Sequence, residues 1–327
     1  RCCRDTHPVV TVWPVAAIAD LRSYGSHQPP YSTLSLTDHH LNLLSKMSDK
    51  DQKATYRDRY LPGPNGKYFV RIWSPEEHSR GVPIILFHDS LGSVELWRNF
   101  PEELCAKTGL QVIAYDRLGF GRSDANPEKL PLDFIAKEAD CGFAVVRQQL
   151  RIDRFAMFGH SVGGGMAINV AAKHGEDCVA LITVSAQAFV EDKTIRGLEE
   201  ARQLFKDHEQ VSRLKKYHGE KAEWVLDAWI GSWLHPDFAG WSLRSVLPLI
   251  KCPLLVIHGI HDEYGTPRHP ELIGELSGGK VRVEILADTR HMPHREKEGI
   301  VVGMVAEFLR SVQLKRLPLD RQLRGEC

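Results

Sequence analysis

The sequence predicts an α/β fold: a mostly parallel, doubly wound sheet with helices on both faces and an inserted helical cap. Short apolar runs alternate along the chain with stretches of helical periodicity, as expected of parallel strands joined by right-handed crossover helices. Residues 185–253 contain helical signals and no strand signal, and this length exceeds what one crossover helix needs. We therefore expect a helical cap there, over the edge at which the strands end.

The individual elements follow from residue 55 onward. The turn 62–66 (Pro-Gly-Pro-Asn-Gly) lies between two alternating segments and predicts an antiparallel hairpin. The continuous apolar run 82–87 predicts a strand covered on both faces. Strands are expected at 55–60, 68–73, 82–87, 111–115, 154–158, 179–184, 254–258 and 281–286. Helices are expected at 96–107, 133–150, 163–173, 198–205, 222–234 and 300–312.

The domain organisation follows from these elements. We expect an α/β core at 47–187 and 247–314, a cap or lid at 188–246 and a C-terminal tail at 315–327. Residues 1–46 are expected to be a disordered extension, because prolines interrupt their apolar stretch and the first methionine is Met47. No stretch approaches the roughly 18 to 20 apolar residues that a membrane span needs.

Composition narrows the function classes. Among 327 residues, Lys+Arg and Asp+Glu both number 42, and this balance argues against nucleic acid or an anionic membrane as partner. The seven cysteines include no CxxC pair and no metal-ligand spacing, so we expect buried free thiols, no metal and a cytoplasmic location. Cysteines in predicted elements are Cys105, Cys141, Cys178 and Cys252.

A nucleophile is indicated at Ser161. Gly159-His160-Ser161-Val162-Gly163 directly follows a predicted strand and opens a predicted helix. A sharp strand-to-helix turn forces its central residue into strained backbone angles, so the neighbouring residues must be very small. The helix N-terminus also favours developing negative charge. A glycine-rich turn with no catalytic function is the alternative.

Several motifs, in this order, carry a resemblance to a known family. They are residues 87–93 (FHDSLGS), 116–124 (DRLGFGRSD), 159–164 (GHSVGG), 258–263 (HGIHDE) and 291–296 (HMPHRE). In these motifs the chain resembles the α/β-hydrolase superfamily, in its cap-bearing branch of esterases, C–C hydrolases and proline-iminopeptidase-like enzymes. The resemblance covers residues 55–312.

The resemblance implies the partners of Ser161. His291, shortly after the last strand, is expected to be the catalytic base, while His294 has a packing role. Asp262 lies just past the strand 254–258, where a carboxylate can orient an imidazole, and is expected to be the acid. Glu263 is its neighbouring alternative, and Asp192 is the position that some relatives use.

The oxyanion hole is expected to use the backbone N–H groups of Val162 and Ser90. The chain departs from the family here, because His88-Asp89 stands where a His-Gly dipeptide is common. Asp tolerates a positive φ less well than Gly, so the backbone of this loop is in doubt. The carboxylate also adds a charge near the pocket.

The remaining candidates concern the substrate pocket. Residues 116–124 lack the third glycine of a dinucleotide fingerprint, so by resemblance they form a structural loop that brings Phe120 to the pocket, which His160 also borders. Aromatic residues of the cap either form its core or line an apolar cavity. These are Trp224, Trp229, Trp233 and Trp241.

Together these features predict a serine hydrolase that cleaves a carboxylic ester of a small, largely apolar molecule through an acyl-enzyme. No cofactor and no nucleic-acid partner are expected, and a homodimer is left open. C–C bond hydrolysis and amide cleavage at an N-terminal proline use the same triad and are the enzymatic alternatives. A non-catalytic small-molecule binding protein on this fold is the alternative of another class.

Overall fold

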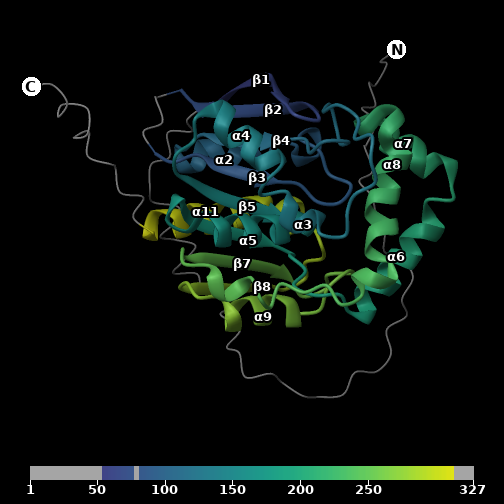
Figure 1. The fold of residues 1–327 in the computed structure, drawn as a ribbon. Coiled ribbons are helices and arrows are strands. Elements are labelled where there is room, and N and C mark those ends of the chain that lie inside the picture. Colours follow the sequence, from purple (N-terminus) through teal and green to yellow (C-terminus); the bar gives the residue numbers. More distant parts are fainter. Residues whose placement is uncertain (1–53, 77–80, 313–327) are drawn as a thin grey trace, which may run out of the picture. The chain divides into compact units, whose positions relative to one another are not determined.

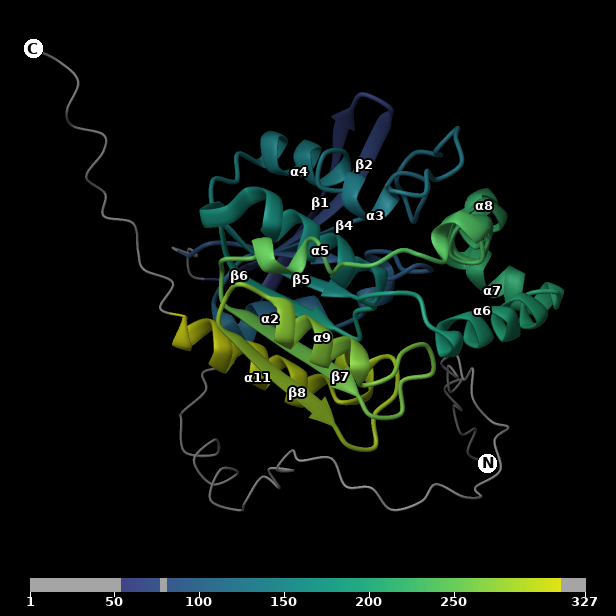
Figure 2. The same ribbon diagram turned by 60° about the horizontal axis from the view of Figure 1, so that its bottom comes forward.

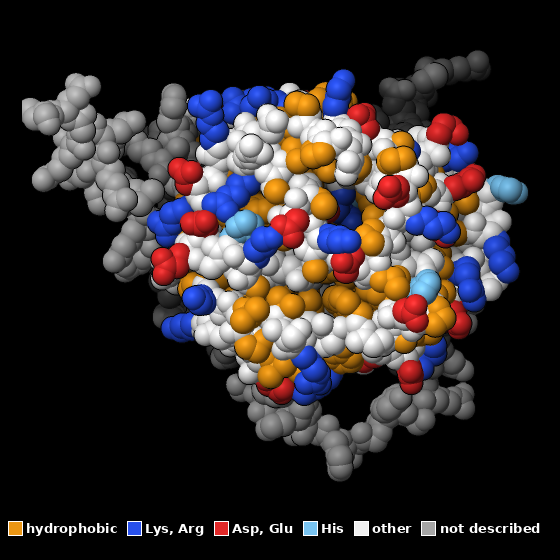
Figure 3. Space-filling view, viewed as in Figure 1, with side chains coloured by type: hydrophobic (Ala, Val, Ile, Leu, Met, Phe, Trp, Pro, Cys, Tyr) orange, Lys and Arg blue, Asp and Glu red, His pale blue; other side chains and the backbone are white. Residues whose placement is uncertain are grey.

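The structure is a computed structural model that describes residues 54–76 and 81–312. The expected extension 1–46 and the tail 315–327 lie outside the described residues. Figure 3 shows basic and acidic side chains interspersed over the face viewed, with apolar side chains between them. Among the described residues, no helix is both long and apolar enough to cross a membrane.

The core of the fold is an eight-stranded sheet of order β1-β2-β4-β3-β5-β6-β7-β8 (Figure 1). The first two strands form the expected antiparallel hairpin, β2 pairs antiparallel with β4, and the neighbouring pairs from β4 to β8 are parallel. The strands are β1 (Ala54–Gly63), β2 (Gly66–Pro75), β3 (Ile84–Phe87), β4 (Val112–Tyr115), β5 (Phe155–His160), β6 (Cys178–Val184), β7 (Leu254–Gly259) and β8 (Val281–Leu286). The predicted mostly parallel sheet is therefore confirmed.

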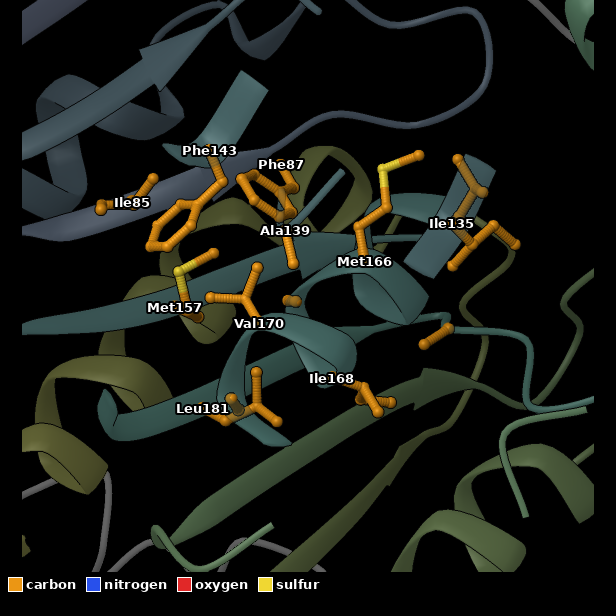
Figure 4. Close-up of a cluster of buried hydrophobic side chains, with 14 of the residues drawn as sticks. Ile85, Phe87, Ile135, Ala139, Phe143, Met157, Met166, Ile168, Val170 and Leu181 are labelled. Carbon is orange, nitrogen blue, oxygen red and sulfur yellow. The ribbon is translucent and has the colours of Figure 1, made fainter. Parts of the chain in front are cut away.

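Helices cover both faces of the sheet, as a doubly wound fold requires. One apolar cluster packs β strands against α4, α5 and α9, and includes Ile85, Phe143, Met157 and Val170 (Figure 4). The other packs the opposite face against α2 and α11. The helices are α2 (Phe100–Thr108), α3 (Phe134–Lys137), α4 (Gly142–Leu150), α5 (Val162–His174), α9 (Arg268–Leu276), α10 (Pro293–Glu296) and α11 (Glu298–Ser311).

Two expected helices are interrupted. The helix expected at 96–107 begins only at Phe100, because Arg98 has a φ of 56° and ends a preceding 3-10 turn. The helix expected at 133–150 is two helices, α3 and α4. The Tyr115 hydroxyl donates a hydrogen bond to Glu138, and a Cβ at residue 142 would lie 2.2 Å from that carboxylate. The glycine leaves room for this carboxylate, and the chain leaves helical geometry at the preceding residue, Cys141.

Residues 188–246, called the helical insertion below, lie between β6 and β7. They contain helices and no strand, only an isolated bridge between Phe189 and Ser242. Figures 1 and 2 show α6, α7 and α8 beyond the ends of the parallel strands. The elements are α6 (Asp192–Leu204), α7 (His208–His218), α8 (Ala222–Leu226), a π turn (Asp227–Gly231) and a 3-10 turn (Pro236–Phe238). The sequence analysis did not find α7.

The cysteines follow the expectation with one exception. Cys105, Cys178 and Cys252 are buried free thiols, whereas Cys141 is exposed, contrary to the expectation. Cys141 occupies the break between α3 and α4, as the residue before the first turn of α4. The other cysteines lie outside the described residues.

Candidate active site

Ser161 occupies the turn between β5 and α5, with φ 56° and ψ −126°. A non-glycine residue held in this region costs about 1 to 3 kcal/mol, and the surrounding structure must impose it. The Ser161 N–H donates to the carbonyl of Val184 (2.9 Å) and its carbonyl accepts from Gly164 N–H (2.8 Å), which anchors the turn at both ends. The side chain is 7% exposed, so the hydroxyl is accessible but confined.

The glycines around Ser161 meet a strict steric demand. A Cβ at Gly159 would lie 2.2 Å from the carbonyl oxygen of Gly163, and a Cβ at Gly163 would lie 2.3 Å from that of Phe87. At Gly164 the added atom would lie 2.5 Å from the Cβ of Ala186. Backbone atoms cannot move away as a flexible side chain can, so the tight turn needs glycine at these positions.

The carboxylate of Asp262 lies against the imidazole of His291. Both carboxylate oxygens lie 2.9 Å from His291 Nδ1, so Nδ1–H can donate to Asp262 and leave Nε2 as the free nitrogen. The backbone N–H groups of Tyr264 and Gly265 also donate to Asp262 Oδ1, at 2.8 and 3.1 Å. Asp262 is fully buried and follows β7, whose end therefore positions the acid.

The alternative acids occupy other places. Glu263 Oε2 accepts a hydrogen bond from the backbone N–H of His291 (3.0 Å), so it supports the segment rather than the imidazole. Asp192 is the first residue of α6. Of the carboxylates weighed in the sequence analysis, Asp262 is the one that the structure places at His291 Nδ1.

The contact between Asp262 and His291 shifts the pKa of each group in the direction that suits a general base. Burial favours the neutral acid, but the charge and hydrogen bond of His291 outweigh it and hold the pKa of Asp262 well below its ordinary value. Burial disfavours the charged imidazole, but the charge and hydrogen bond of Asp262 prevail and raise the pKa of His291. An imidazole held in this way accepts a proton more readily than a free one.

His160 and Gln187 connect the Ser161 turn to its surroundings. The His160 ring centroid lies 5.0 Å from that of His291, and its Nε2 lies 2.8 Å from the backbone oxygen of His291. The Ser161 hydroxyl donates a long hydrogen bond to Gln187 Oε1 (3.4 Å). Sequence analysis missed Gln187, although its position shortly after β6 places it at the edge where parallel strands end.

The expected oxyanion donors follow β5 and β3, which are neighbouring parallel strands. Val162 is the first residue of α5, and a backbone N–H in the first turn of a helix has no partner within the helix. Ser90 lies in the turn after β3. Asp89 is not among the described non-glycine residues with positive φ, so the doubt about this backbone does not hold. Its Oδ1 accepts the Leu91 N–H (2.9 Å), which stabilises the turn.

Phe120 and the four tryptophans of the helical insertion have different surroundings. Phe120 is buried beneath the Arg117 guanidinium (4.1 Å to the ring) and borders a cavity of about 230 Å³ that Leu130, Phe134 and Met166 also line. None of the expected tryptophans is among the described residues lining this cavity.

The four tryptophans occupy three different places. Trp229 lies 5.9 Å from the ring of Tyr264, which in turn lies 4.9 Å from that of His291. Trp233 and Trp241 pack together (5.5 Å) in the core of the insertion. The ring of Trp224 covers Gly119, where an added Cβ would lie 2.3 Å from it. Core and site-facing positions therefore coexist in the insertion.

His294 lies beside His160. The His294 ring is buried against His160 (4.5 Å), Trp97 (5.1 Å) and Phe100 (5.6 Å), which is a packing role. No group of His, Cys, Asp and Glu within the described ranges could hold a metal ion.

Comparison with known proteins gives the same fold. A family model described as the alpha/beta hydrolase fold matches residues 82–217. The enol-lactonase from Burkholderia xenovorans LB400 superposes with a TM-score of 0.62 at 20% identity, covering 77% of this chain and 100% of that one. At this level of identity the superposition shows a common fold.

Two curated relatives match shorter segments. Serine hydrolase BPHL from Homo sapiens is 26% identical over 190 residues, which cover 56% of this chain and 64% of that protein. Proline iminopeptidase from Lactobacillus delbrueckii subsp. lactis is 31% identical over 111 residues, covering 34% of this chain and 37% of that protein. The chain thus matches less than two thirds of the length of each of these relatives.

Proposed function

Because this chain belongs to the α/β-hydrolase superfamily, with hydrolases among its relatives, we propose that it is a serine hydrolase acting on carboxylic esters of small, largely apolar molecules. The backbone of Ser161 carries the proposal. Ser161, at φ 56°, joins the end of β5 to the start of α5, which is the strained strand-to-helix turn that presents a nucleophile, whereas Ser185, at φ 48°, begins no helix.

In the proposed reaction His291 Nε2 accepts the Ser161 proton as Oγ attacks the ester carbonyl carbon. The carbonyl oxygen becomes an oxyanion held by the N–H groups of Val162 and Ser90. His291 then gives its proton to the leaving alkoxide, and the acyl group stays on Ser161. Water repeats the sequence and releases the acid, while Asp262 stabilises the imidazolium in both halves.

The test is hydrolysis of p-nitrophenyl esters of increasing acyl length by wild type and by Ser161→Ala. We expect Ser161→Ala to lower kcat by at least about 10³-fold. Ser185→Ala is the matched control, because Ser185 is also a buried serine with positive φ (48°), and its hydroxyl has no hydrogen-bond partner within the described part of the chain. It should retain turnover.

Two results would overturn the proposal in different ways. If proline p-nitroanilide is cleaved in a Ser161-dependent reaction and no ester is, the chain is an amide hydrolase, as the name of one relative suggests. If nothing is cleaved and an alkyl fluorophosphonate does not modify Ser161, the chain is a binding protein on this fold.

A further inference from the structure

The imidazole of His160 lies between two hydrogen-bond acceptors. Its Nε2 is 2.8 Å from the backbone oxygen of His291, and its Nδ1 is 3.3 Å from Asp89 Oδ2. The ring is 1% exposed, so water does not substitute for either partner. The ring joins both acceptors when each nitrogen carries a proton, with Nε2 donating to the His291 carbonyl and Nδ1 donating to Asp89. His160 therefore holds the backbone of the residue that we propose as the base.

Asp89 holds a second segment of the site at the same time. Its Oδ1 accepts the N–H of Leu91 (2.9 Å), and its backbone oxygen accepts the Gly92 N–H (3.2 Å) and Arg117 Nη2 (2.9 Å). These contacts order the turn that contains Ser90. One carboxylate thus contacts both the turn with an expected oxyanion donor and the ring that holds His291.

The charge of Asp89 is compensated locally. Burial favours its neutral form, but the hydrogen bond and charge of His160, with the charges of Arg295 and His88, keep its pKa below the ordinary range. Burial is the largest influence on His160 and lowers its pKa. The hydrogen bond and the charge of Asp89 oppose this effect and favour the protonated ring.

We propose that Asp89 and His160 are positioning residues, which tie the turn at Ser90 to the backbone of His291 and so set the base against the oxyanion hole. The inference rests on the proposed function and assigns a use to Asp89, which stands where related sequences commonly have glycine. Glycine at this position could order neither Leu91 N–H nor the His160 ring.

Two substitutions that introduce a side-chain amide distinguish the contact of His160 with the His291 carbonyl from its contact with Asp89. In His160→Gln the side-chain amide reaches the position of Nε2 and can still donate to the His291 carbonyl. In His160→Asn the amide reaches only the position of Nδ1, near Asp89, and the His291 carbonyl loses its donor. Asp89→Asn keeps an oxygen for Leu91 N–H but removes the charge, and Asp89→Gly removes both.

The chemical shift of the His291 carbonyl reports on its hydrogen bond with His160 and requires no enzymatic turnover. His291 and Met292 form the only His–Met dipeptide in the sequence, so labelling with ¹³C′-histidine and ¹⁵N-methionine yields a single cross-peak for this bond. We expect the His291 carbonyl shift to be retained in His160→Gln and changed in His160→Asn and Asp89→Gly. Unchanged shifts in both of the latter variants would overturn the proposal.

The rate at which Ser161 is chemically modified measures how this contact affects the site. We expect modification of Ser161 by an alkyl fluorophosphonate to slow less in His160→Gln, which keeps a donor to the His291 carbonyl, than in His160→Asn and Asp89→Gly. In the latter two variants the rate should fall at least about tenfold, an increase of roughly 1.4 kcal/mol in the activation barrier. Asp89→Asn tests the charge, because the negative charge of Asp89 contributes to raising the pKa of His291. That variant should titrate His291 at lower pH.

The two proposals fail separately. If wild type is not modified at Ser161 while the carbonyl shift responds as expected, the serine-hydrolase function is wrong and the link from Asp89 to His291 stands. If Ser161 reacts equally fast in wild type, His160→Asn and Asp89→Gly, the function stands and the positioning role is wrong. Melting temperatures of all variants identify any that fail to fold, and His160→Gln and Asp89→Asn, which keep the size of the native side chains, then decide the case.

Discussion

Around Ser161 the chain is held by close approaches between backbone atoms, whereas the helical insertion is held to the α/β core by contacts of its side chains, both polar and apolar. A Cβ at Gly163 would penetrate the backbone of β3, so the turn has no room to vary. In the insertion, His218 accepts from Gly121 N–H (2.9 Å) and donates to the Leu91 carbonyl (3.0 Å), and Lys221 donates to the carbonyls of Gly121 and Ser123. Apolar contacts add to these, since Phe238 of the insertion stacks on Phe134 of α3 with 6.0 Å between the ring centroids. The turn is specified by backbone shape, and the insertion by side-chain contacts.

The difference has a consequence for dynamics and for function. A turn enclosed by backbone can move only if β3 and β5 separate, which requires unfolding of the sheet. An insertion held by side-chain contacts can detach while the sheet remains folded, because local opening costs only the contacts that it breaks. The proposed nucleophile is therefore expected to be rigid and the helical insertion adjustable.

The largest expected effect is at the turn. Gly163→Ala should lower the free energy of unfolding by at least about 3 kcal/mol, because the new Cβ would lie 2.3 Å from the Phe87 carbonyl oxygen and the strand must shift. Gly303→Ala in α11 is the matched control. Apart from the backbone of its own helix, no atom of the described residues lies within 4 Å of its added Cβ, and helical alanine should stabilise the protein by about 0.5 to 1 kcal/mol. Urea denaturation measures both, and equal stability of the two variants would contradict the steric account of the turn.

The same contrast decides what the sequence could predict. The turn was predictable because its requirement is local: a strand, small residues and a helix start occur within a few positions of Ser161. The strands β3 to β8 were predictable for a similar reason, since each is a continuous or alternating apolar run. The order of motifs then placed Asp262 and His291 at one sheet edge, although no local pattern states their separation in space.

The parts that sequence reasoning missed depend on distant partners. The break between α3 and α4 depends on the hydrogen bond between Tyr115 and Glu138, which lie on different elements. The helix α7 ends in His218, whose partners are Leu91 and Gly121, far away in the chain. Helical periodicity and strand patterns contain no information about such pairs, so these features appear only once the sheet has assembled.

At the insertion a smaller and more local effect is expected. His218→Ala removes both hydrogen bonds and leaves the buried Gly121 N–H without an acceptor, which should cost about 2 to 4 kcal/mol. Hydrogen exchange should become faster in α6 to α8 while β5 and β6 remain protected. His208→Ala, an exposed position at the start of the same helix, should leave exchange unchanged. Uniform acceleration over the whole sheet would show that the insertion and the core open together.

As the pH falls, activity should be lost before the helical insertion is destabilised. The raised pKa of His291 means that the base is lost as pH falls through a value above 6.5, so kcat/KM on a p-nitrophenyl ester should have its acidic midpoint there. His218 has its pKa lowered to about 4, chiefly by burial, so the folded insertion binds this proton less readily than the unfolded chain. Its contribution to stability is complete above pH 6.5 and is lost progressively between pH 6.5 and 4, by about 1.4 kcal/mol per pH unit.

This order of events is measurable as activity and hydrogen exchange on the same samples. Between pH 6.5 and 4, kcat/KM should already be low while exchange in the insertion accelerates steadily. His258, buried at the end of β7 with its pKa also lowered to about 4, adds a similar acid sensitivity in the sheet. If exchange in the insertion accelerates before kcat/KM falls, detachment of the insertion, and not protonation of His291, limits activity in acid.

The smallest expected effects distinguish two tryptophans within the helical insertion. Trp233 is 3% exposed and packs against Phe238 (5.2 Å), so Trp233→Phe should lower the free energy of unfolding by about 1 kcal/mol and leave KM unchanged. Trp229 lies on the path through Tyr264 to His291, so Trp229→Phe should change KM several-fold between short and long acyl esters, with less than about 0.5 kcal/mol in stability. The pair is matched in chemistry and differs only in what the ring touches. A KM effect in Trp233→Phe that equals that of Trp229→Phe would mean that the insertion acts as one body and that its inner aromatic residues also determine which substrate is accepted.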